Sequence, residues 1–477
     1  MTVKNNTIAQ ALDEAPLGLF HLRAVLISGL GFFTDAYDLF IIGAALVLIK
    51  SEWHLSSTMV GLVGSTTLLA NFFGALIFGR LADVLGRKKL YGLVATIMSI
   101  GAILTALSPN IFWLIAFRFI LGLGIGGDYP ISAVIMSEYA NVRDRGKLVG
   151  LVFSMQALGL IAGPMVALTL LASGINHDLA WRIMLGLGAL PAMSVIYARR
   201  KMPESPRFQA QVLGSADTAA EQLQVYSKGQ VQVKRLAQTD GAAGESAAKI
   251  GFWKFVSNGR LLLTLLGTAG TWFLFDYAYY GNSISTPLIM DMIVPHASLI
   301  QREAWSLIIF AIAAVPGYAL AVAKIDKIGH KRLQLIGFLV MGLAFLCMGV
   351  IPGLTSTLIP FLVVYGISYF FAEFGPNTTT FILPAELFPI RVRTTAHGIS
   401  AGVAKVGAFI GVFLFPILLH LFKLQGTFVI TFVFSILGAL LTLVLPEPAN
   451  QSMDSISGNR VHDSVQPVSS SARHSSV

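Results

Sequence analysis

The stretch Gly79-Arg80-Leu81-Ala82-Asp83-Val84-Leu85-Gly86-Arg87-Lys88-Lys89 is matched later in the chain by Asp326-Lys327-Ile328-Gly329-His330-Lys331-Arg332. In both copies an aspartate (Asp83 or Asp326) precedes a glycine (Gly86 or Gly329) by three positions, and basic residues such as Arg87 follow at once. A glycine suits a tight turn, and an aspartate can cap a helix or pair with an arginine of a neighbouring helix. An ordinary basic loop explains one copy, but it does not explain two copies that stand 243 positions apart.

A second pair of short segments repeats at nearly the same distance. Glu138 precedes Arg143-Asp144-Arg145 by five positions, and Glu386 precedes Arg391-Val392-Arg393 by five, at an offset of 248. We therefore expect two halves built on one plan. The repeated Asp-x-x-Gly-basic loop resembles the signature of the major facilitator superfamily, which implies two six-helix halves related by an axis along the membrane normal.

The composition indicates a chain that spans a membrane many times. Of its 477 residues 55% are hydrophobic and 12% charged, and the mean hydropathy is +0.73, whereas about a quarter of a soluble domain is charged. Apolar runs of about 20 residues match a bilayer core of roughly 30 Å. They predict an all-α membrane protein with twelve transmembrane helices in two pseudo-symmetric halves, at residues 23–49, 56–79, 90–108, 111–136, 148–172, 181–198, 261–289, 303–323, 333–351, 357–383, 396–421 and 426–445.

The net charge of +9 follows the topology rather than a nucleic-acid surface. Of the 33 lysines and arginines, 27 fall in the termini and the loops on one side, 4 fall in the opposite loops, and Arg118 and Lys405 fall inside helices. This positive-inside bias predicts that both termini are cytoplasmic. The expected organisation is a cytoplasmic N-terminal tail at 1–22, a six-helix bundle at 23–200, a cytoplasmic central loop at 201–260, a second bundle at 261–446 and a cytoplasmic C-terminal tail at 447–477.

Several classes of function are disfavoured by what the sequence lacks. The one cysteine, Cys347, lies in an apolar run, and no metal-ligand cluster, nucleophile–base pair or ATP-binding Gly-rich loop occurs. We therefore expect no enzyme, no cofactor and no metal. The polar N-terminus lacks the order of a signal peptide, which favours a multi-pass protein of a cell membrane, either inner or plasma.

Charged residues inside the predicted spans mark the functional region, because each costs about 2.5–3.5 kcal/mol at membrane depth. The predicted spans contain more acidic residues than basic ones, of which there are two, Arg118 and Lys405. Ion pairing therefore cannot neutralise every carboxylate, and at least one carboxylate is expected to gain and lose a proton. Arg118 and Asp128 stand ten residues apart and are expected to line one side of their helix. The acids within the spans are Asp35, Asp38, Asp128, Asp276 and Glu373.

Two helical patterns refine this picture. Trp272, Asp276 and Tyr280 recur every four positions and form one stripe of hydrogen-bonding side chains. The run Gly122-Leu123-Gly124-Ile125-Gly126-Gly127 has the spacing of a dinucleotide-binding loop, but it lies inside an apolar segment without a preceding strand. These glycines are expected to permit close helix approach or local bending.

The sequence also resembles the phosphate:proton symporters of the same superfamily, over nearly the whole chain outside the tails and central loop. The resemblance rests on GFFTDAYDLF, GGDYPISA, WFLFDYAYYG and the long FGPNTTTFILPAELFPIRVRTTAHGISAGVAKVGA, while PESPR (203–207) also occurs in sugar carriers. It implies proton-path roles for Asp35, Asp38 and Asp128, with Arg118 modulating Asp128. It implies a phosphate site formed by Tyr129, Gln156, Trp272, Asp276, Tyr280, Asn377 and Lys405.

The chemistry of these residues agrees in part with such a site. Lys405 is a point charge suited to an oxyanion, and Tyr129 and Gln156 offer neutral donors. Protonated Asp276 can donate to phosphate, and its deprotonation would repel the anion and release it. Tyr129 and Asn377 stand 248 positions apart, the repeat offset, so the proposed site is pseudo-symmetric.

Glu373 departs from the family pattern, in which a neutral residue is expected. It lies four residues before Asn377, where a carboxylate could titrate, bind a cation, change the substrate preference or be inert in a pair. The leading hypothesis is a monomeric symporter that imports inorganic phosphate with protons by alternating access, with phosphate, protons and the lipid bilayer as partners. The alternatives are a proton-coupled carrier of an organic anion, a sugar or another small solute, and a nutrient sensor that uses the same site.

Overall fold

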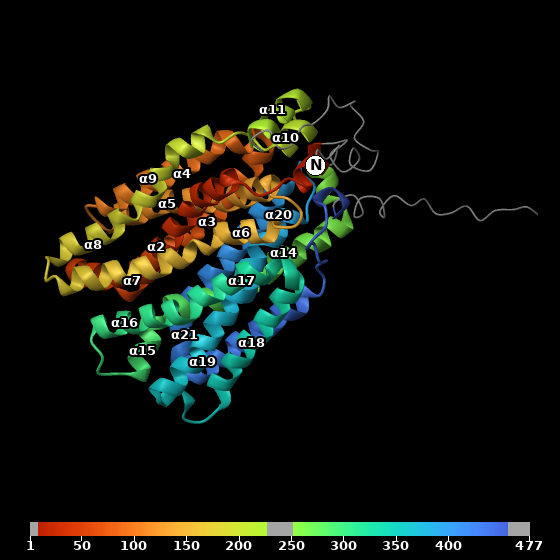
Figure 1. The fold of residues 1–477 in the computed structure, drawn as a ribbon. Helices are drawn as coiled ribbons and strands as arrows, with labels where there is room; N and C mark the ends of the chain where they lie inside the picture. The colour runs from red at the N-terminus through yellow and green to blue at the C-terminus, as the bar shows by residue number, and fades with distance from the viewer. Residues whose placement is uncertain (1–7, 227–250, 457–477) are drawn as a thin grey trace, which may run out of the picture.

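The computed structural model describes residues 8–226 and 251–456, which form helices and no strand (Figure 1). Parts of the three expected cytoplasmic segments, at 1–7, 227–250 and 457–477, lie outside the described residues. The first half contains α1 (Ile8–Asp13), α2 (Leu19–Trp53), α3 (Ser57–Leu85), α4 (Arg87–Ala106), α5 (Ile111–Tyr139), α6 (Arg145–Ser154), α7 (Gln156–Ala172), α8 (His177–Leu187) and α9 (Ala189–Lys201). The short helices α10 (Pro206–Gln211), α11 (Ala216–Tyr226) and α13 (Phe252–Val256) lie between the halves in sequence.

The second half has more interruptions. It contains α14 (Gly259–Ile284), α15 (Thr286–Ile293), α16 (Leu299–Ile309), the π-helical turn η1 (Phe310–Ala314), α17 (Val315–Ile328), α18 (His330–Val350), the 3₁₀ turn η2 (Leu354–Ser356), α19 (Leu358–Ala372), the π-helical turn η3 (Glu373–Asn377), α20 (Thr378–Glu386) and α21 (Arg393–Thr442).

The count of twelve spans is confirmed once α21 is divided. Eleven continuous helical stretches of the described residues are long and apolar enough to cross a bilayer, and the last is α21 with 50 residues. At 1.5 Å per residue such a helix would be about 75 Å long, more than twice the hydrocarbon thickness. Lys423 breaks it with φ 57° and ψ −179°. The break lies between the predicted helices 396–421 and 426–445.

One predicted span is shorter than expected. The apolar run predicted at 261–289 ends as a continuous helix at Ile284, and Ser285 separates it from α15. Pro287 lies in the first turn of α15, where a backbone N–H has no partner within the helix and its absence is tolerated. Proline cannot donate the backbone hydrogen bond that would continue α14.

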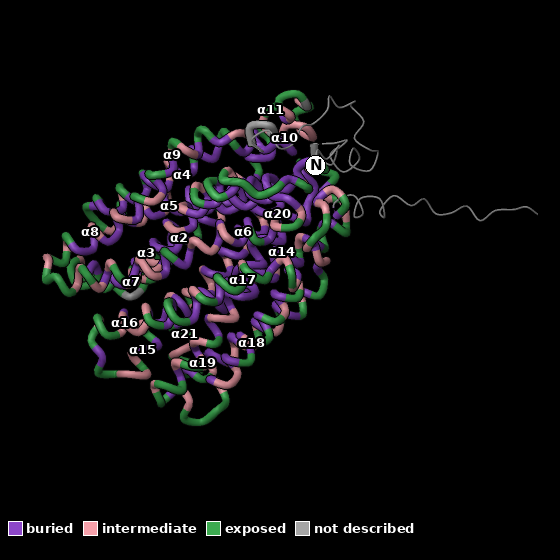
Figure 2. Tube along the Cα trace, viewed as in Figure 1, coloured by how far each residue is buried: buried purple, intermediate pink, exposed green. Residues whose placement is uncertain are grey.

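The two halves lie side by side along their length, with α2 to α9 in one and α14 to α21 in the other (Figure 1). Buried residues follow the seam between the halves, and exposed residues follow the outer faces (Figure 2). The described ends of the chain meet at one end of the bundle, which we call the terminal end. There Arg207 forms ion pairs with both Asp13 and Asp454.

The glycines of α5 confirm the interpretation of close helix approach. A Cβ placed on Gly122 would lie 2.6 Å from the carbonyl oxygen of Thr67, and one on Gly126 would lie 2.1 Å from that of Asn71, both on α3. A Cβ on Gly124 would lie 2.7 Å from the backbone nitrogen of Met98 on α4. These contacts involve backbone atoms, which cannot rotate away. The glycine run therefore lets α5 pack directly against α3 and α4.

We predict that Gly126→Ala destabilises the first half by about 1–3 kcal/mol, because the added methyl group forces α3 and α5 apart. The expected result is a lower melting midpoint of the purified protein in detergent. Gly61→Ala in α3 is the matched control, since a Cβ there has no neighbour within 4 Å. Equal midpoints for the two variants would contradict the packing role of Gly126.

Candidate functional site

The seven residues implied as a substrate site meet at the centre of the bundle. Their side chains come from both halves, and each residue is at most 4% exposed. Helices α5 and α7 supply the members of the first half, while α14, η3 and α21 supply those of the second. The seven are Tyr129, Gln156, Trp272, Asp276, Tyr280, Asn377 and Lys405.

The contribution of the first half is a hydrogen-bonded triangle around Asp35. The Tyr129 hydroxyl donates to Asp35 Oδ2 over 2.6 Å, and Gln156 Nε2 donates to the same oxygen over 3.1 Å. Gln156 Nε2 also lies 3.1 Å from the Tyr129 hydroxyl oxygen. Gln156 begins α7 directly after the interruption at Met155, which sets its side chain at the start of a new helix.

The contribution of the second half is a buried ammonium–carboxylate pair. Lys405 Nζ donates to Asp276 Oδ2 over 3.0 Å and to the Tyr280 hydroxyl over 3.4 Å. The ammonium also lies 4.7 Å from the centre of the Tyr129 ring, so it contacts both halves. The Trp272 ring contacts the same tyrosine, with its centre 6.0 Å from that of the Tyr129 ring. The stripe predicted on this helix therefore faces the other half.

Tyr318 of α17 joins the two sets, and the sequence reasoning missed it. Its hydroxyl donates to Gln156 Oε1 over 3.1 Å and accepts from Asn377 Nδ2 over 2.8 Å. A tyrosine in an apolar run carries no charge, and Tyr318 belongs to neither repeated motif. No pattern in the sequence singled it out.

Aromatic pairs between the halves close the site toward both ends of the bundle. Toward the terminal end, Phe153 of α6 stacks on Phe381 of α20 with ring centres 4.4 Å apart. Toward the other end, Phe40 of α2 meets Phe310 of η1 edge to face, with centres 5.0 Å apart. The structure thus encloses the central residues between two aromatic contacts.

Arg118 and Asp128 do not pair with each other, and a modulating role of Arg118 toward Asp128 stays a prediction. Arg118 forms a bidentate ion pair with Asp38, at 3.1 and 3.0 Å. Asp128 pairs instead with Arg199, whose Nη2 lies 3.0 Å from Asp128 Oδ2. Helical spacing placed Arg118 and Asp128 on one face of α5, but neighbouring helices provide the partner of each.

Arg199 is a second site-region residue that the sequence reasoning missed. The predicted span 181–198 ends one residue before it, whereas α9 continues to Lys201 and Arg199 is fully buried. Gly31 of α2 leaves the room for this pair, because a Cβ there would lie 1.9 Å from Asp128 Oδ2.

The repeated loops form matching contacts across the terminal end. Gly86 and Gly329 have φ values of 91° and 97°, so both turns require glycine. Asp83 accepts from the backbone nitrogens of Thr394 and Thr395 at the start of α21, over 3.2 and 2.7 Å. Asp326 accepts in the same way from Gly146 and Lys147 of α6, over 3.0 and 2.8 Å. Each motif aspartate therefore caps a helix of the opposite half.

Around these caps the second arginine of each repeated segment forms an ion pair, and the first does not. Arg145 pairs with Glu386 over 3.2 Å and Arg393 pairs with Glu138 over 3.4 Å, whereas Arg143 and Arg391 are exposed. Arg145 and Arg393 are the first residues of α6 and α21, so each pairing arginine lies where its helix begins. Arg87 completes this cluster through Asp83, Glu138 and the carbonyl oxygen of Ile390.

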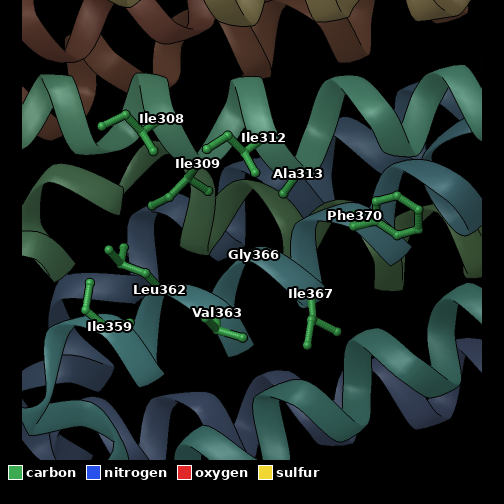
Figure 3. Close-up of a pocket in the computed structure, with 10 residues that line it drawn as sticks. All are labelled: Ile308, Ile309, Ile312, Ala313, Ile359, Leu362, Val363, Gly366, Ile367 and Phe370. Carbon is green, nitrogen blue, oxygen red and sulfur yellow. The ribbon is translucent and has the colours of Figure 1, made fainter.

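A cavity of about 460 Å³ lies between α16 with η1 and α19 (Figure 3). Its lining is apolar and includes Ile308, Ile312, Ile359 and Phe370. It offers no donor to an anion, so the enclosed central residues remain the candidate substrate site. Over residues 8–226 and 251–456, no group of three metal-ligating side chains comes together.

Comparisons with known proteins agree with this architecture. The family described as "Sugar (and other) transporter" matches residues 24–458. The chain is 38% identical to "Probable inorganic phosphate transporter 1-6" of Arabidopsis thaliana, over 95% of this chain and 97% of that one. It is 36% identical to "Inorganic phosphate transporter 1-11" of Oryza sativa subsp. japonica, over 95% of this chain and 90% of that one.

Solved structures show the same fold at low sequence identity. The proton:xylose symporter XylE of E. coli superposes with a TM-score of 0.76 at 18% identity, over 92% of this chain and 98% of that one. The human organic anion transporter MFSD10 gives a TM-score of 0.64 at 16% identity, over 88% and 99%. With its two matched halves and enclosed central site, the chain is a multi-pass membrane transporter rather than an enzyme, and it belongs to the inorganic phosphate transporter family of the major facilitator superfamily.

Proposed function

We propose that this protein is a symporter that imports inorganic phosphate together with protons by alternating access. The observation that carries the proposal is the ammonium group of Lys405, held between Asp276 and Tyr280 at the boundary of the two halves. The relatives that cover almost the whole chain are named inorganic phosphate transporters, which favours phosphate as the cargo.

The site supplies what a small tetrahedral oxyanion needs. Lys405 provides a positive charge, and Tyr129, Gln156, Tyr280 and Asn377 provide neutral donors. Dihydrogen phosphate can donate to Asp276, and a protonated Asp276 can donate to phosphate. When Asp276 loses its proton, the carboxylate repels the anion and again takes Lys405 as its partner, which favours release.

Proton coupling is assigned to carboxylates of the first half together with Asp276. Asp35 has hydrogen-bond partners but, within the described parts of the chain, no basic residue at ion-pair distance, so a proton is its natural counterpart. Asp38 and Asp128 are held by Arg118 and Arg199 and are proposed to respond to charge changes nearby.

Alternating access would be governed by contacts between the halves. At the terminal end these are the caps made by Asp83 and Asp326 with the surrounding ion pairs. We propose that this end is cytoplasmic, in an inner or plasma membrane, and that the monomer is the transporting unit. The domain limits 23–200 and 261–446 are proposed as the moving bodies.

The test is uptake of radiolabelled phosphate into proteoliposomes, with and without an inward proton gradient. We expect gradient-driven uptake by the wild type and a loss of at least about tenfold in Asp276→Asn, because a hydrogen bond to a charged group is worth about 1.5–3 kcal/mol. Asp291→Asn is the control, a partly exposed carboxylate of the same half that pairs with Arg302.

The outcomes distinguish the identity of the transported substrate from the assignment of Asp276 to the binding site. Uptake that survives Asp276→Asn would keep phosphate and discard the assignment of Asp276. No uptake by a folded wild type would reject phosphate, and organic anions and sugars would be screened next.

A further inference from the structure

Glu373 is a buried carboxylate of the second half that has no basic partner among the described residues. The acids Asp38, Asp128 and Asp276 pair with Arg118, Arg199 and Lys405. Glu373 is 0% exposed, and within residues 8–226 and 251–456 no lysine, arginine or histidine lies at ion-pair distance from it. A buried carboxylate without a counter-charge favours its protonated form.

Hydrogen bonds connect Glu373 to Asp35 across the boundary between the halves. Asn377 Nδ2 donates to Glu373 Oε2 over 2.5 Å and to the Tyr318 hydroxyl over 2.8 Å. Tyr318 donates to Gln156 over 3.1 Å, and Gln156 donates to Asp35 over 3.1 Å. Asp35 and Glu373, which have no basic partner within the described parts of the chain, are therefore the two ends of one series of hydrogen bonds.

The π-helical turn η3, which carries Glu373, packs closely against α17 and α18. A Cβ on Gly317 would lie 3.0 Å from the Glu373 Cβ, and a Cβ on Gly337 would lie 2.6 Å from the Gly375 Cα. Glu373 and Asn377 are the two ends of the π-helical turn η3, and such turns recur at functional sites. Within the described residues the carboxylate is fully buried and has no ion-pair partner, so a proton is its simplest counterpart.

The titratable neighbours of Glu373 are tyrosines. Tyr279 of α14, Tyr318 of α17 and Tyr369 of α19 interact with it electrostatically. The basic residues of α17 and α18 lie near the turn between them at Gly329, and Glu386 ends α20. The charged groups of the central site are the Asp276–Lys405 pair and Asp35, and Asp35 is connected to Glu373 only through the intervening hydrogen bonds. None of these side chains neutralises Glu373.

We propose that Glu373 is a second proton-binding group of the transport cycle, linked to the first half through Asn377 and Tyr318. In each cycle one proton from one aqueous phase forms an O–H bond with the carboxylate, and the same bond breaks to release that proton on the other side. The ionised group is a strong acceptor for Asn377 and the acid is a weak one. When Glu373 takes up a proton, its hydrogen bond from Asn377 weakens, and the Asn377 amide becomes available to donate to Tyr318 and to the substrate. This inference rests on the proposed function.

The test compares the proton:phosphate ratio of the wild type with that of Glu373→Gln in proteoliposomes containing a pH-sensitive dye. We expect the ratio to fall by one proton per phosphate. Glu303→Gln is the matched control. Glu303 is another acid of the second half, is 3% exposed, and takes no part in the hydrogen bonds that connect Glu373 to Asp35. An unchanged ratio in Glu373→Gln overturns the proposal, as does an equal fall in both variants.

A second measurement does not depend on phosphate. Infrared difference spectra of the detergent-solubilised protein between acid and alkaline pH should contain a carboxylic-acid band that Glu373→Gln removes and Glu303→Gln keeps. If the band is present but phosphate uptake is absent, the cargo is wrong and the proton site stands. If no band depends on Glu373, the proton site is wrong whatever the cargo. Glu373→Asn replaces the glutamine variant if the latter does not fold.

The link to the first half is tested with Tyr318→Phe, which removes only the hydroxyl group. We expect this variant to keep the infrared band and to lose the extra proton per phosphate. An unchanged ratio in Tyr318→Phe would overturn the link. Uptake driven by a sodium gradient in the wild type, and lost in Glu373→Gln, would overturn the proton as the bound ion.

Discussion

Lys405→Met is expected to weaken phosphate binding by at least about 100-fold, because it removes the positive charge of the site and leaves Asp276 to repel the anion. A hydrogen bond to a charged group is worth about 1.5–3 kcal/mol, and the repulsion adds to this loss. The pair is fully buried, with 3.0 Å between Lys405 Nζ and Asp276 Oδ2. Binding of radiolabelled phosphate to the purified protein measures the effect.

The same substitution also tests how much the Asp276–Lys405 ion pair contributes to the stability of the fold. Removing one partner of a buried ion pair costs about 3–5 kcal/mol, whereas removing both charges is often nearly neutral. The double variant Asp276→Asn/Lys405→Met should therefore regain the wild-type melting midpoint but not phosphate binding. Lys324→Met, at an exposed position of α17, is the control. Binding by Lys405→Met within about threefold of wild type would refute the role of Lys405 as the anion anchor.

Arg199→Met is expected to destabilise the first half by about 3–5 kcal/mol, because Asp128 then remains buried without a counter-charge. Arg199 is fully buried and bidentate to Asp128, and its guanidinium lies 4.3 Å from the centre of the Tyr91 ring. The melting midpoint in detergent and the recovery of folded protein measure the loss.

Two further variants make the test specific to the pair. Arg200→Met removes the exposed neighbouring charge and should leave the midpoint unchanged. Asp128→Asn/Arg199→Met should recover part of the loss, since it removes both charges together. A midpoint for Arg199→Met equal to that of Arg200→Met would show that Asp128 is satisfied by another group.

The sequence determined the membrane fold because the relevant signals are local. The length of each apolar run fixes a span, and the break at Lys423 falls where the runs 396–421 and 426–445 are separated. The Asp83 and Asp326 motifs predicted two matched halves because a glycine turn is encoded within a few residues. The stripe of Trp272, Asp276 and Tyr280 was visible because four-residue spacing aligns side chains on one helix face.

The pairing of charges was decided only by the tertiary structure. Spacing placed Arg118 and Asp128 on one side of α5, yet Asp38 and Arg199 are their partners. The role of Tyr318 was likewise hidden, because a tyrosine in an apolar run has no distinguishing pattern. Helical periodicity fixes the direction in which a side chain leaves its own helix. Which other helix meets that face depends on how the halves pack, through contacts between residues distant in sequence, and no local pattern encodes it.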